Sequence, residues 1–270
     1  MSGATPVPFA DVALARRLER AEATSCACFV EARARLFPAS GACWIAVAGA
    51  YAMFDGVASP VTQTFGLGMF QAPAAGDLDR LETFFGERGA PSHHEVSPLA
   101  DPAVVPLLTG RGYQPFEFTS VMYRPIAAGG VASRPGPVVR RLGAGEHELY
   151  ARVAAEGWRD SGYADFMLEI GRVSAHTDGL HMFVAELDGT AIAAGAMHLR
   201  DGVAHLAGAS TIPEGRRRGA QLALLEQRLQ FAAASGCDIA LMGASPGSGS
   251  QRNAERHGFR IAYTRIKWRQ

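Results

Sequence analysis

The chain has 270 residues, enough for about two domains, and 48% of them are hydrophobic, which is enough to bury a core in each. Twenty-six Lys and Arg residues balance twenty-six Asp and Glu residues, and this formal charge of zero argues against nucleic acid or an anionic membrane as the main partner. No apolar segment approaches the ~20 residues that span a bilayer, and the N-terminus has no secretory pattern, so we expect a cytoplasmic protein.

The first half of the chain predicts an α/β unit. An amphipathic helix is expected at 78–85, a strand at 93–97, a helix at 103–108, and a final strand that follows Gly112 and ends at Tyr123. His93, His94 and Glu95 are consecutive, but neighbouring residues of a strand face opposite sides, so they share no face that could hold a ligand. We therefore expect no metal.

Residues 126–137, with the sequence IAAGGVASRPGP, are rich in Gly, Ala, Ser and Pro. Their apolar residues follow neither the helical nor the strand periodicity. This composition predicts a linker between two domains, at 1–125 and 138–270. Four cysteines occur in the chain, at Cys26, Cys28, Cys43 and Cys237. They form no CxxC pair and no dense disulfide pattern, so we expect reduced thiols.

The second half predicts a longer series of elements. A strand is expected at 138–142, helices at 146–158 and 165–176, and strands at 181–187, 190–199 and 203–212, the last three joined by Asp-Gly turns. A helix at 219–235, a strand at 239–244, a helix at 250–257 and a strand at 259–268 follow. Gly258 precedes an aromatic residue and a strand, as Gly112 does, so we interpret the chain as two copies of one unit.

The segment 206–225, LAGASTIPEGRRRGAQLALL, predicts an anion site. A helix N-terminus presents unpaired backbone N–H groups and the positive end of the helix dipole. Arg216, Arg217 and Arg218 add charges that are unfavourable there without a bound anion, and Gly219 lets the backbone approach a phosphate. Solvated surface arginines are the alternative. Neither a Walker loop nor a dinucleotide-binding glycine fingerprint is present.

This segment resembles the signature of the GNAT N-acetyltransferase superfamily, R/Q-x-x-G-x-G/A between the fourth strand and the next helix. The corresponding residues here are RRRGAQ, at 216–221, and the resemblance covers 138–269, including the closing helix-Gly-Phe-strand at 255–259. It implies an α/β (α+β) fold with two GNAT-like domains, each a central, mixed, mostly antiparallel sheet flanked by helices.

Two positions depart from the family pattern. Gln221 replaces Gly or Ala at the last signature position, so its longer side chain must turn away from the anion. Ala254 stands where the family often has a tyrosine acid. In the first half, the corresponding loop QAPAAGD has no basic residue, so we expect a degenerate copy that does not bind a coenzyme pyrophosphate.

The resemblance implies acetyl-CoA as cosubstrate, and direct acetyl transfer to a primary amine of a small molecule or a peptide. Backbone groups at Ala209 and Thr211 would bind the pantetheine, and Ser250 and Asn253 would bind its amide or the thiol. The residues implied for the pyrophosphate are Arg216, Arg217, Arg218, Gly219, Ala220 and Gln221. Ser250, water or the attacking ammonium itself would protonate the departing thiolate. Ordinary helix-capping hydrogen bonds are the alternative for Ser250 and Asn253.

His205 stands eleven residues before Arg216, where the histone-acetylating branch of the family places its base glutamate, and it is our candidate general base. A strand histidine without a role is the alternative. The substitutes for the base are His198, Glu156 and Asp160. By the same resemblance, the helical segment that lines the acceptor side contains Trp158, Tyr163 and Phe166, although core packing would also explain these aromatics.

Two other functions remain open at this stage. One is a catalytically silent acyl-CoA-binding sensor, and the other is a structural pseudo-dimer without coenzyme. A monomer containing an internal pseudo-dimer and a homodimer are both compatible with the sequence, and the acceptor is not identified, because acceptor pockets vary widely on one fold.

Overall fold

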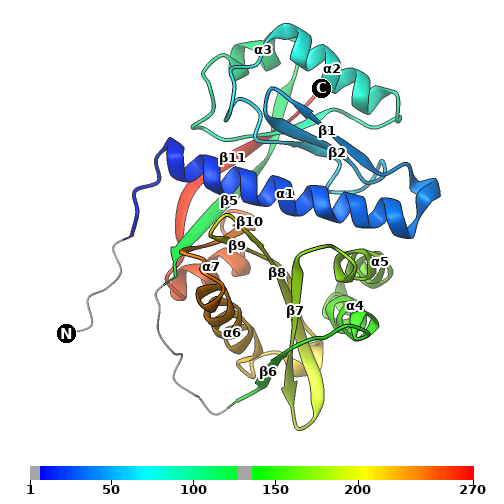
Figure 1. The fold of residues 1–270 in the computed structure, drawn as a ribbon, viewed down its shortest axis with the longest axis vertical. Coiled ribbons are helices and arrows are strands. Elements are labelled where there is room, and N and C mark those ends of the chain that lie inside the picture. The colour runs from blue at the N-terminus through cyan, green and yellow to red at the C-terminus, as the bar shows by residue number, and fades with distance from the viewer. Residues whose placement is uncertain (1–6, 127–135) are drawn as a thin grey trace. The chain divides into compact units, whose positions relative to one another are not determined.

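The computed structural model describes residues 7–126 and 136–270 and divides the chain into two compact units (Figure 1). Unit 1 holds residues 125–240, and unit 2 holds residues 7–124 together with 241–270. Most of the predicted linker, 127–135, lies outside the described residues. The predicted domain boundaries stay a prediction, and the compact units depart from them in the last thirty residues, which group with the first half.

Unit 1 is an antiparallel sheet with helices on both faces. Its strands are β6 (Val138–Arg141), β7 (Leu180–Leu187), β8 (Thr190–Arg200) and β9 (Val203–Thr211), in the order β9-β8-β7-β6. Helices α4 (His147–Glu156) and α5 (Ala164–Ala175) cover one face, and α6 (Ala220–Ala234) covers the other (Figure 1). Strand β10 (Ile239–Ala244) begins in unit 1 and continues into unit 2.

The two predicted Asp-Gly turns join the long strands of unit 1. Asp188 and Gly189 both have positive φ, at 52° and 75°, and so do Asp201 and Gly202, at 45° and 78°. Two successive residues with positive φ make the turn whose twist matches the flanking strands, which is why Asp-Gly is favoured there. The predicted hairpins are confirmed.

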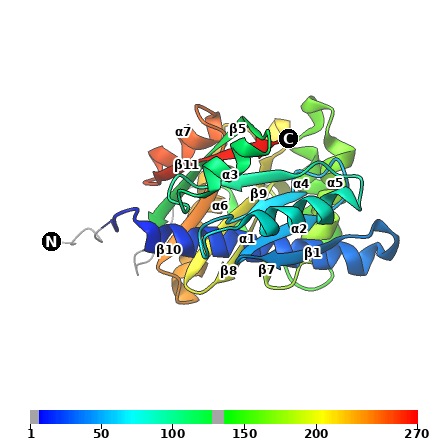
Figure 2. The ribbon, with the colours of Figure 1, turned by 90° about the horizontal axis from the view of Figure 1, so that it is seen from above.

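Unit 2 begins with the long helix α1 (Val12–Leu36), which lies against two strands, β1 (Cys43–Val47) and β2 (Ala50–Phe54) (Figure 2). The elements that follow are β3 (Gln63–Phe65), α2 (Ala75–Gly86), β4 (His93–Val96), α3 (Val104–Gly110), β5 (Gln114–Pro125), α7 (Gly249–Arg256) and β11 (Arg260–Arg269). The strand order is β1-β2-β3-β4-β11-β5, antiparallel except between β3 and β4. The mixed, mostly antiparallel α/β class is confirmed.

The final strand β11 explains why residues 241–270 group with the first half of the chain. It pairs antiparallel with β4 on one edge, where Trp268 lies opposite His94, and with β5 on the other, where Arg265 lies opposite Thr119. Gly112 and Gly258, which precede the two similar strands β5 and β11, both have a φ of 83°. A left-handed residue therefore turns the chain into each of these strands.

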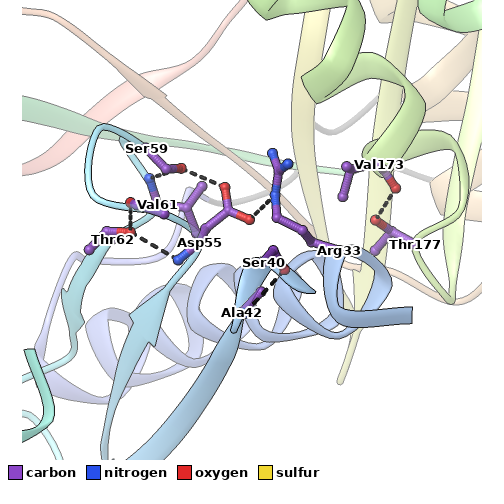
Figure 3. Close-up of polar contacts among 10 residues, drawn as sticks. Arg33, Ser40, Ala42, Asp55, Ser59, Val61, Thr62, Val173 and Thr177 are labelled. Carbon is purple, nitrogen blue, oxygen red and sulfur yellow. Dashed lines mark hydrogen bonds and ion pairs between the residues drawn. The ribbon is translucent and has the colours of Figure 1, made fainter. Parts of the chain in front are cut away.

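The turn between β2 and β3 is held by the buried carboxylate of Asp55 (Figure 3). Arg33 of α1 pairs with Asp55 Oδ1, and Ser59 Oγ donates to Asp55 Oδ2 at 2.6 Å. The Asp55 N–H donates to Thr62 Oγ1 at 2.9 Å. These bonds satisfy a charge that would otherwise be costly to bury, and they fix the turn against α1.

A buried ionic network also ties α1 to β4 and β11. Arg265 Nη1 lies 3.0 Å from Glu95 Oε2 and 3.5 Å from Glu19 Oε2, and Arg265 Nη2 donates to Glu22 Oε2 at 2.6 Å. Tyr263 Oη donates to Glu19 Oε1 at 2.8 Å. Burial raises the pKa of Glu19 to about 7; the charges of Glu22 and Glu95 add to this rise, and Arg265 opposes it.

Glu19→Gln should flatten the pH dependence of stability. Between the unfolded pKa of about 4.3 and the folded value, the native chain holds a proton that the unfolded chain has released. The free energy of unfolding therefore falls as the pH rises through this window, by about 2 to 3 kcal/mol. Urea melts at several pH values measure this fall. Glu31→Gln, an exposed change on the same helix, is the control and should keep it; a fall that persists in Glu19→Gln would contradict the assignment.

Across residues 7–126 and 136–270, no helix combines the length and the apolar character that a membrane span requires.

Candidate coenzyme site

The site is built on the turn between β9 and α6. This turn contains the short helix η3 (Pro213–Gly215), and it is fixed to β8 because the Ile212 N–H donates to Ile192 O at 3.0 Å. Gly215 is buried, and a Cβ on it would lie 2.8 Å from Ile192 Cβ. Only glycine permits this close approach, so the position of the turn on the sheet is set by packing.

The first turn of α6 presents unused backbone donors. The Arg216 N–H donates to Pro213 O at 3.3 Å, and the next backbone donor to be bonded is Ala223, which donates to Gly219 O at 3.0 Å. In this described segment, no N–H of 217–222 donates a hydrogen bond. Gly219 has a φ of 81°, and a Cβ on it would meet open space. Backbone groups arranged in this way, at the positive end of a helix, are able to bind an anion.

The three predicted arginines differ in their surroundings. Arg217 and Arg218 are exposed, and within the described residues neither makes an ion pair or a hydrogen bond. Arg217 has a φ of 63°, a left-handed conformation that costs a non-glycine residue about 1 to 3 kcal/mol. Arg216 is engaged elsewhere: Nη1 donates to Asp160 Oδ2 at 2.8 Å, and Nη2 to Gly157 O at 3.3 Å. Two of the three charges are therefore available at the turn.

The glutamine at the last signature position does not cover the donors. Gln221 Nε2 donates to Thr211 Oγ1 at 2.7 Å, so the side chain is directed onto β9. Ala220 beside it is buried. Gln221 and Thr211 thus link the start of α6 to the end of β9 and leave the backbone donors open.

Strand β9 contains a bulge that the sequence analysis did not predict. Ala194 lies opposite Ser210 and Ala196 lies opposite Ala207, so Gly208 and Ala209 face Gly195 alone. Gly208 has a φ of 59°, and a Cβ on it would lie 2.5 Å from the Tyr150 hydroxyl, which is 3.5 Å from Gly208 O. A bulge removes backbone groups from the strand ladder and makes them available to a ligand. The glycine within a strand was the signal for it.

The candidate bases lie in a buried part of the same sheet. His205 is on β9, three residues before the bulge, directly opposite His198 of β8. They are 8% and 5% exposed, and burial lowers the pKa of His198. The two carboxylate substitutes are engaged in ion pairs, Glu156 with Arg159 and Asp160 with Arg216.

Ser250 and Asn253 lie on α7, in unit 2, and are exposed. The hydroxyl of Ser248, the N-cap residue two positions before Ser250, caps this helix by accepting from the Gln251 N–H at 3.1 Å. The Asn253 carbonyl oxygen lies 2.6 Å from His257 Nδ1. These two candidates and the turn belong to different compact units, and the roles of Ser250 and Asn253 stay a prediction. Ala254 is buried on the same helix.

The connection between α4 and α5 is tied to the turn. Arg159 pairs with Glu156 and with Glu214, whose Oε1 lies 2.5 Å from Arg159 Nη2. A cavity of about 420 Å³ opens between these helices, with lining residues that include Val153, Glu156, Asp165, Leu168 and Ile212.

Three aromatic side chains near this connection are largely exposed. The exposed fractions are 42% for Trp158, 61% for Tyr163 and 41% for Phe166. Core packing, the alternative explanation from the sequence, does not account for side chains with this much exposure.

In unit 2, the helix start that corresponds to the start of α6 is the start of α2, and it carries a negative side chain instead of arginines. The Ala74 N–H donates to Asp77 Oδ2 at 2.9 Å, so the carboxylate of the protein itself caps the start of α2. In the preceding loop, Leu67 and Met69 are buried. An anion at this helix start would be repelled by Asp77.

His94 and Glu95, on strand β4, are engaged in packing and in an ion pair. The His94 ring packs in a tilted arrangement against the Tyr113 ring, and burial lowers the pKa of His94 to about 3. The Glu95 carboxylate pairs with Arg265. Within the described parts of the chain, no three His, Cys, Asp or Glu side chains are grouped to hold a metal ion.

Comparison with known proteins relates part of the chain to a family. A model of the acetyltransferase (GNAT) family matches residues 144–259. A GCN5-related N-acetyltransferase from Kribbella flavida shares the fold over 95% of this chain and 95% of its own, with a TM-score of 0.68 and 17% identity. One from Sphaerobacter thermophilus gives a TM-score of 0.54 over 77% of this chain and 71% of its own, with 16% identity.

A tandem GNAT protein from the clavulanic acid biosynthesis pathway gives a TM-score of 0.59 over 82% of this chain and 78% of its own, with 11% identity. No curated protein matches at a significant level. Identities this low show the fold alone, whereas the family match covers the turn and both flanking elements. Residues 144–259 are therefore a domain of the GNAT acetyltransferase family, and the chain has the fold of GCN5-related N-acetyltransferases.

Proposed function

We propose that the chain transfers an acetyl group from acetyl-CoA to a primary amine by direct attack. The observation that carries this proposal is the row of unbonded N–H groups at 217–222, flanked by Arg217 and Arg218, at the end of a bulged strand. A pyrophosphate satisfies both the backbone donors and the arginines. The GNAT family uses acetyl-CoA at this motif, which supports the choice of anion.

The coenzyme binds in unit 1 under this proposal. Its pyrophosphate is held by 217–222, and its pantetheine bonds to backbone groups of β9 around Ala209 and Thr211. Asp77 at the start of α2 argues against a second coenzyme in unit 2. Arg216 joins the anion only by giving up its ion pair with Asp160.

Proton transfer is assigned to His205 through a water molecule. An alkyl ammonium with a pKa near 10 must lose a proton before it attacks, so a base is needed near neutral pH. The thiolate that leaves takes a proton from Ser250 or from water. The cavity between α4 and α5, with the exposed aromatics beside it, is the proposed acceptor side.

A panel of amines tests the proposed function. Purified protein is mixed with acetyl-CoA and with aliphatic, aromatic and peptide amines, and free thiol and acetylated product are measured. Thiol release that depends on one class of amine, with a matching product mass, is the expected result. Coenzyme binding without such release would favour the acyl-CoA sensor, which the missing tyrosine at Ala254 also favours. Absence of binding would favour the structural pseudo-dimer.

Gly219→Ala should weaken coenzyme binding about tenfold, which corresponds to about 1.4 kcal/mol. The added methyl group projects into the open space in front of the anion site. Gly236→Ala, at the other end of the same helix, is a matched control, because Gly236 also has a φ of 81° and open space around it. Both variants should lose similar stability from backbone strain. Equal coenzyme affinities in the two variants, measured by calorimetry, would contradict the placement of the anion.

A further inference from the structure

Arg228 of α6 is buried without a counter-charge. It is 4% exposed, Nη1 donates to Ala196 O at 3.0 Å, and Nε donates to Leu224 O at 3.2 Å. Among the described residues, no carboxylate lies within ion-pair distance of its guanidinium. Burial lowers its pKa to about 10, so the side chain still carries its charge at neutral pH. A buried and uncompensated cation costs several kcal/mol, roughly, relative to an apolar side chain of similar size.

The charge lies next to the bulge of β9. A Cβ on Gly195 would lie 3.2 Å from the guanidinium carbon, and Gly195 is the single residue that faces Gly208 and Ala209. The titratable group whose charge acts on Arg228 is Tyr150, and the Tyr150 hydroxyl lies 3.5 Å from Gly208 O. With a Cα–Cβ bond of about 1.5 Å and adjacent strands about 4.8 Å apart, the guanidinium carbon is within roughly 10 Å of the bulge.

We propose that Arg228 is a positioning residue of the acetyl transfer, whose buried charge stabilises negative charge that develops on the thioester oxygen beside the bulge. This rests on the proposed function. As the amine nitrogen bonds to the carbonyl carbon, the carbonyl π pair moves to oxygen. That pair then re-forms the C=O bond as the C–S bond breaks and its electrons leave with sulfur, and the thiolate takes up the proton that the nitrogen releases, relayed by water. A fixed cation in a site of low dielectric lowers the energy of the charged state without having to reorganise.

A purely structural role is the competing explanation. Arg228 fixes two backbone carbonyls, and the loss of these hydrogen bonds would loosen α6 against β8. The two roles differ in what they change. A structural role changes the melting temperature and the coenzyme affinity, whereas a charge effect changes the rate of the acyl step and the polarisation of the bound carbonyl.

The test compares Arg228→Met, Arg228→Lys and the control Arg200→Met, which removes an exposed charge from the same strand region. With acetyl-CoA at saturation, kcat should fall about 10- to 50-fold in Arg228→Met, with the acetyl-CoA Kd within about threefold of the wild type. Arg228→Lys, which keeps a charge, should recover most of kcat. Arg200→Met should match the wild type.

A second measurement works without turnover. The infrared stretching frequency of the acetyl-CoA carbonyl is identified with a ¹³C label. In the wild type, bound acetyl-CoA should absorb at a lower frequency than free acetyl-CoA, and in Arg228→Met the frequency should lie close to that of free acetyl-CoA. If the carbonyl stretch in Arg228→Met equals that of the wild type, or if Arg228→Lys is as slow as Arg228→Met, this inference is wrong while the proposed function still stands. If the wild type does not bind acetyl-CoA, the proposed function fails as well. If Arg228→Met does not fold, the same two measurements are made on Arg228→Lys.

Discussion

His205→Ala should lower kcat/KM by about 10² to 10⁴ and leave the affinity for acetyl-CoA unchanged. Removal of the base leaves the amine protonated at neutral pH, so the rate should also lose an ionisation on the acidic limb of its pH profile. His198→Ala is the matched control, because His198 lies directly opposite on β8 and is equally buried. His198→Ala should cause a similar loss of packing but should keep the wild-type rate.

A wild-type rate in His205→Ala between about pH 6 and 9 would place the base elsewhere. If His198→Ala were then inactive, His198 would take its place. Asp160→Asn and Glu156→Gln test the two carboxylates, which lie in ion pairs with Arg216 and Arg159.

The double variant Arg217→Ala with Arg218→Ala should weaken coenzyme A binding by about 2 to 4 kcal/mol, from about 1 to 2 per charge-assisted contact. Neither arginine makes an ion pair within the described residues, so both charges are available to a phosphate. Calorimetry at two salt concentrations measures the loss, and the wild type should depend more steeply on salt.

Arg216→Ala is the contrast within the same turn. Because Arg216 is engaged with Asp160 and Gly157, its removal should change affinity by less than about threefold, below 1 kcal/mol. An unchanged affinity in the double variant, or a larger loss in Arg216→Ala than in the double variant, would contradict the assignment of the site.

Elements with a strong local pattern could be predicted from the sequence. Strand β10 has the bounds that its apolar run predicted, and α6 differs by one residue at each end. Helix α1 was not predicted, because charged residues such as Glu19 and Arg33 are buried on its inner face and interrupt the apolar periodicity. Strands β1 to β3 are three to five residues long, too short for a clear alternation.

The turn before α6 could be predicted because its arginines, glycine and helix start are neighbours in the chain, and its role as an anion site stays a prediction. The features that depend on distant residues could not. Arg216 pairs with Asp160, 56 residues away, and the Tyr150 hydroxyl reaches the bulge, 58 residues away. Arg228 had a local signal, since it lies among Leu224, Leu225 and Leu229 on the buried face of α6. The position of β11 between β4 and β5 has no local signal at all.

Hydrogen exchange with and without acetyl-CoA tests the central claim most directly, that the coenzyme is held by the start of α6. The N–H groups of 217–222 make no hydrogen bond in the described structure, so they should exchange rapidly in the free protein. Acetyl-CoA should slow exchange at these amides and leave the start of α2, where Asp77 caps the helix, unchanged. Unaltered exchange at 217–222 with saturating acetyl-CoA, or protection at the start of α2 instead, would contradict the claim.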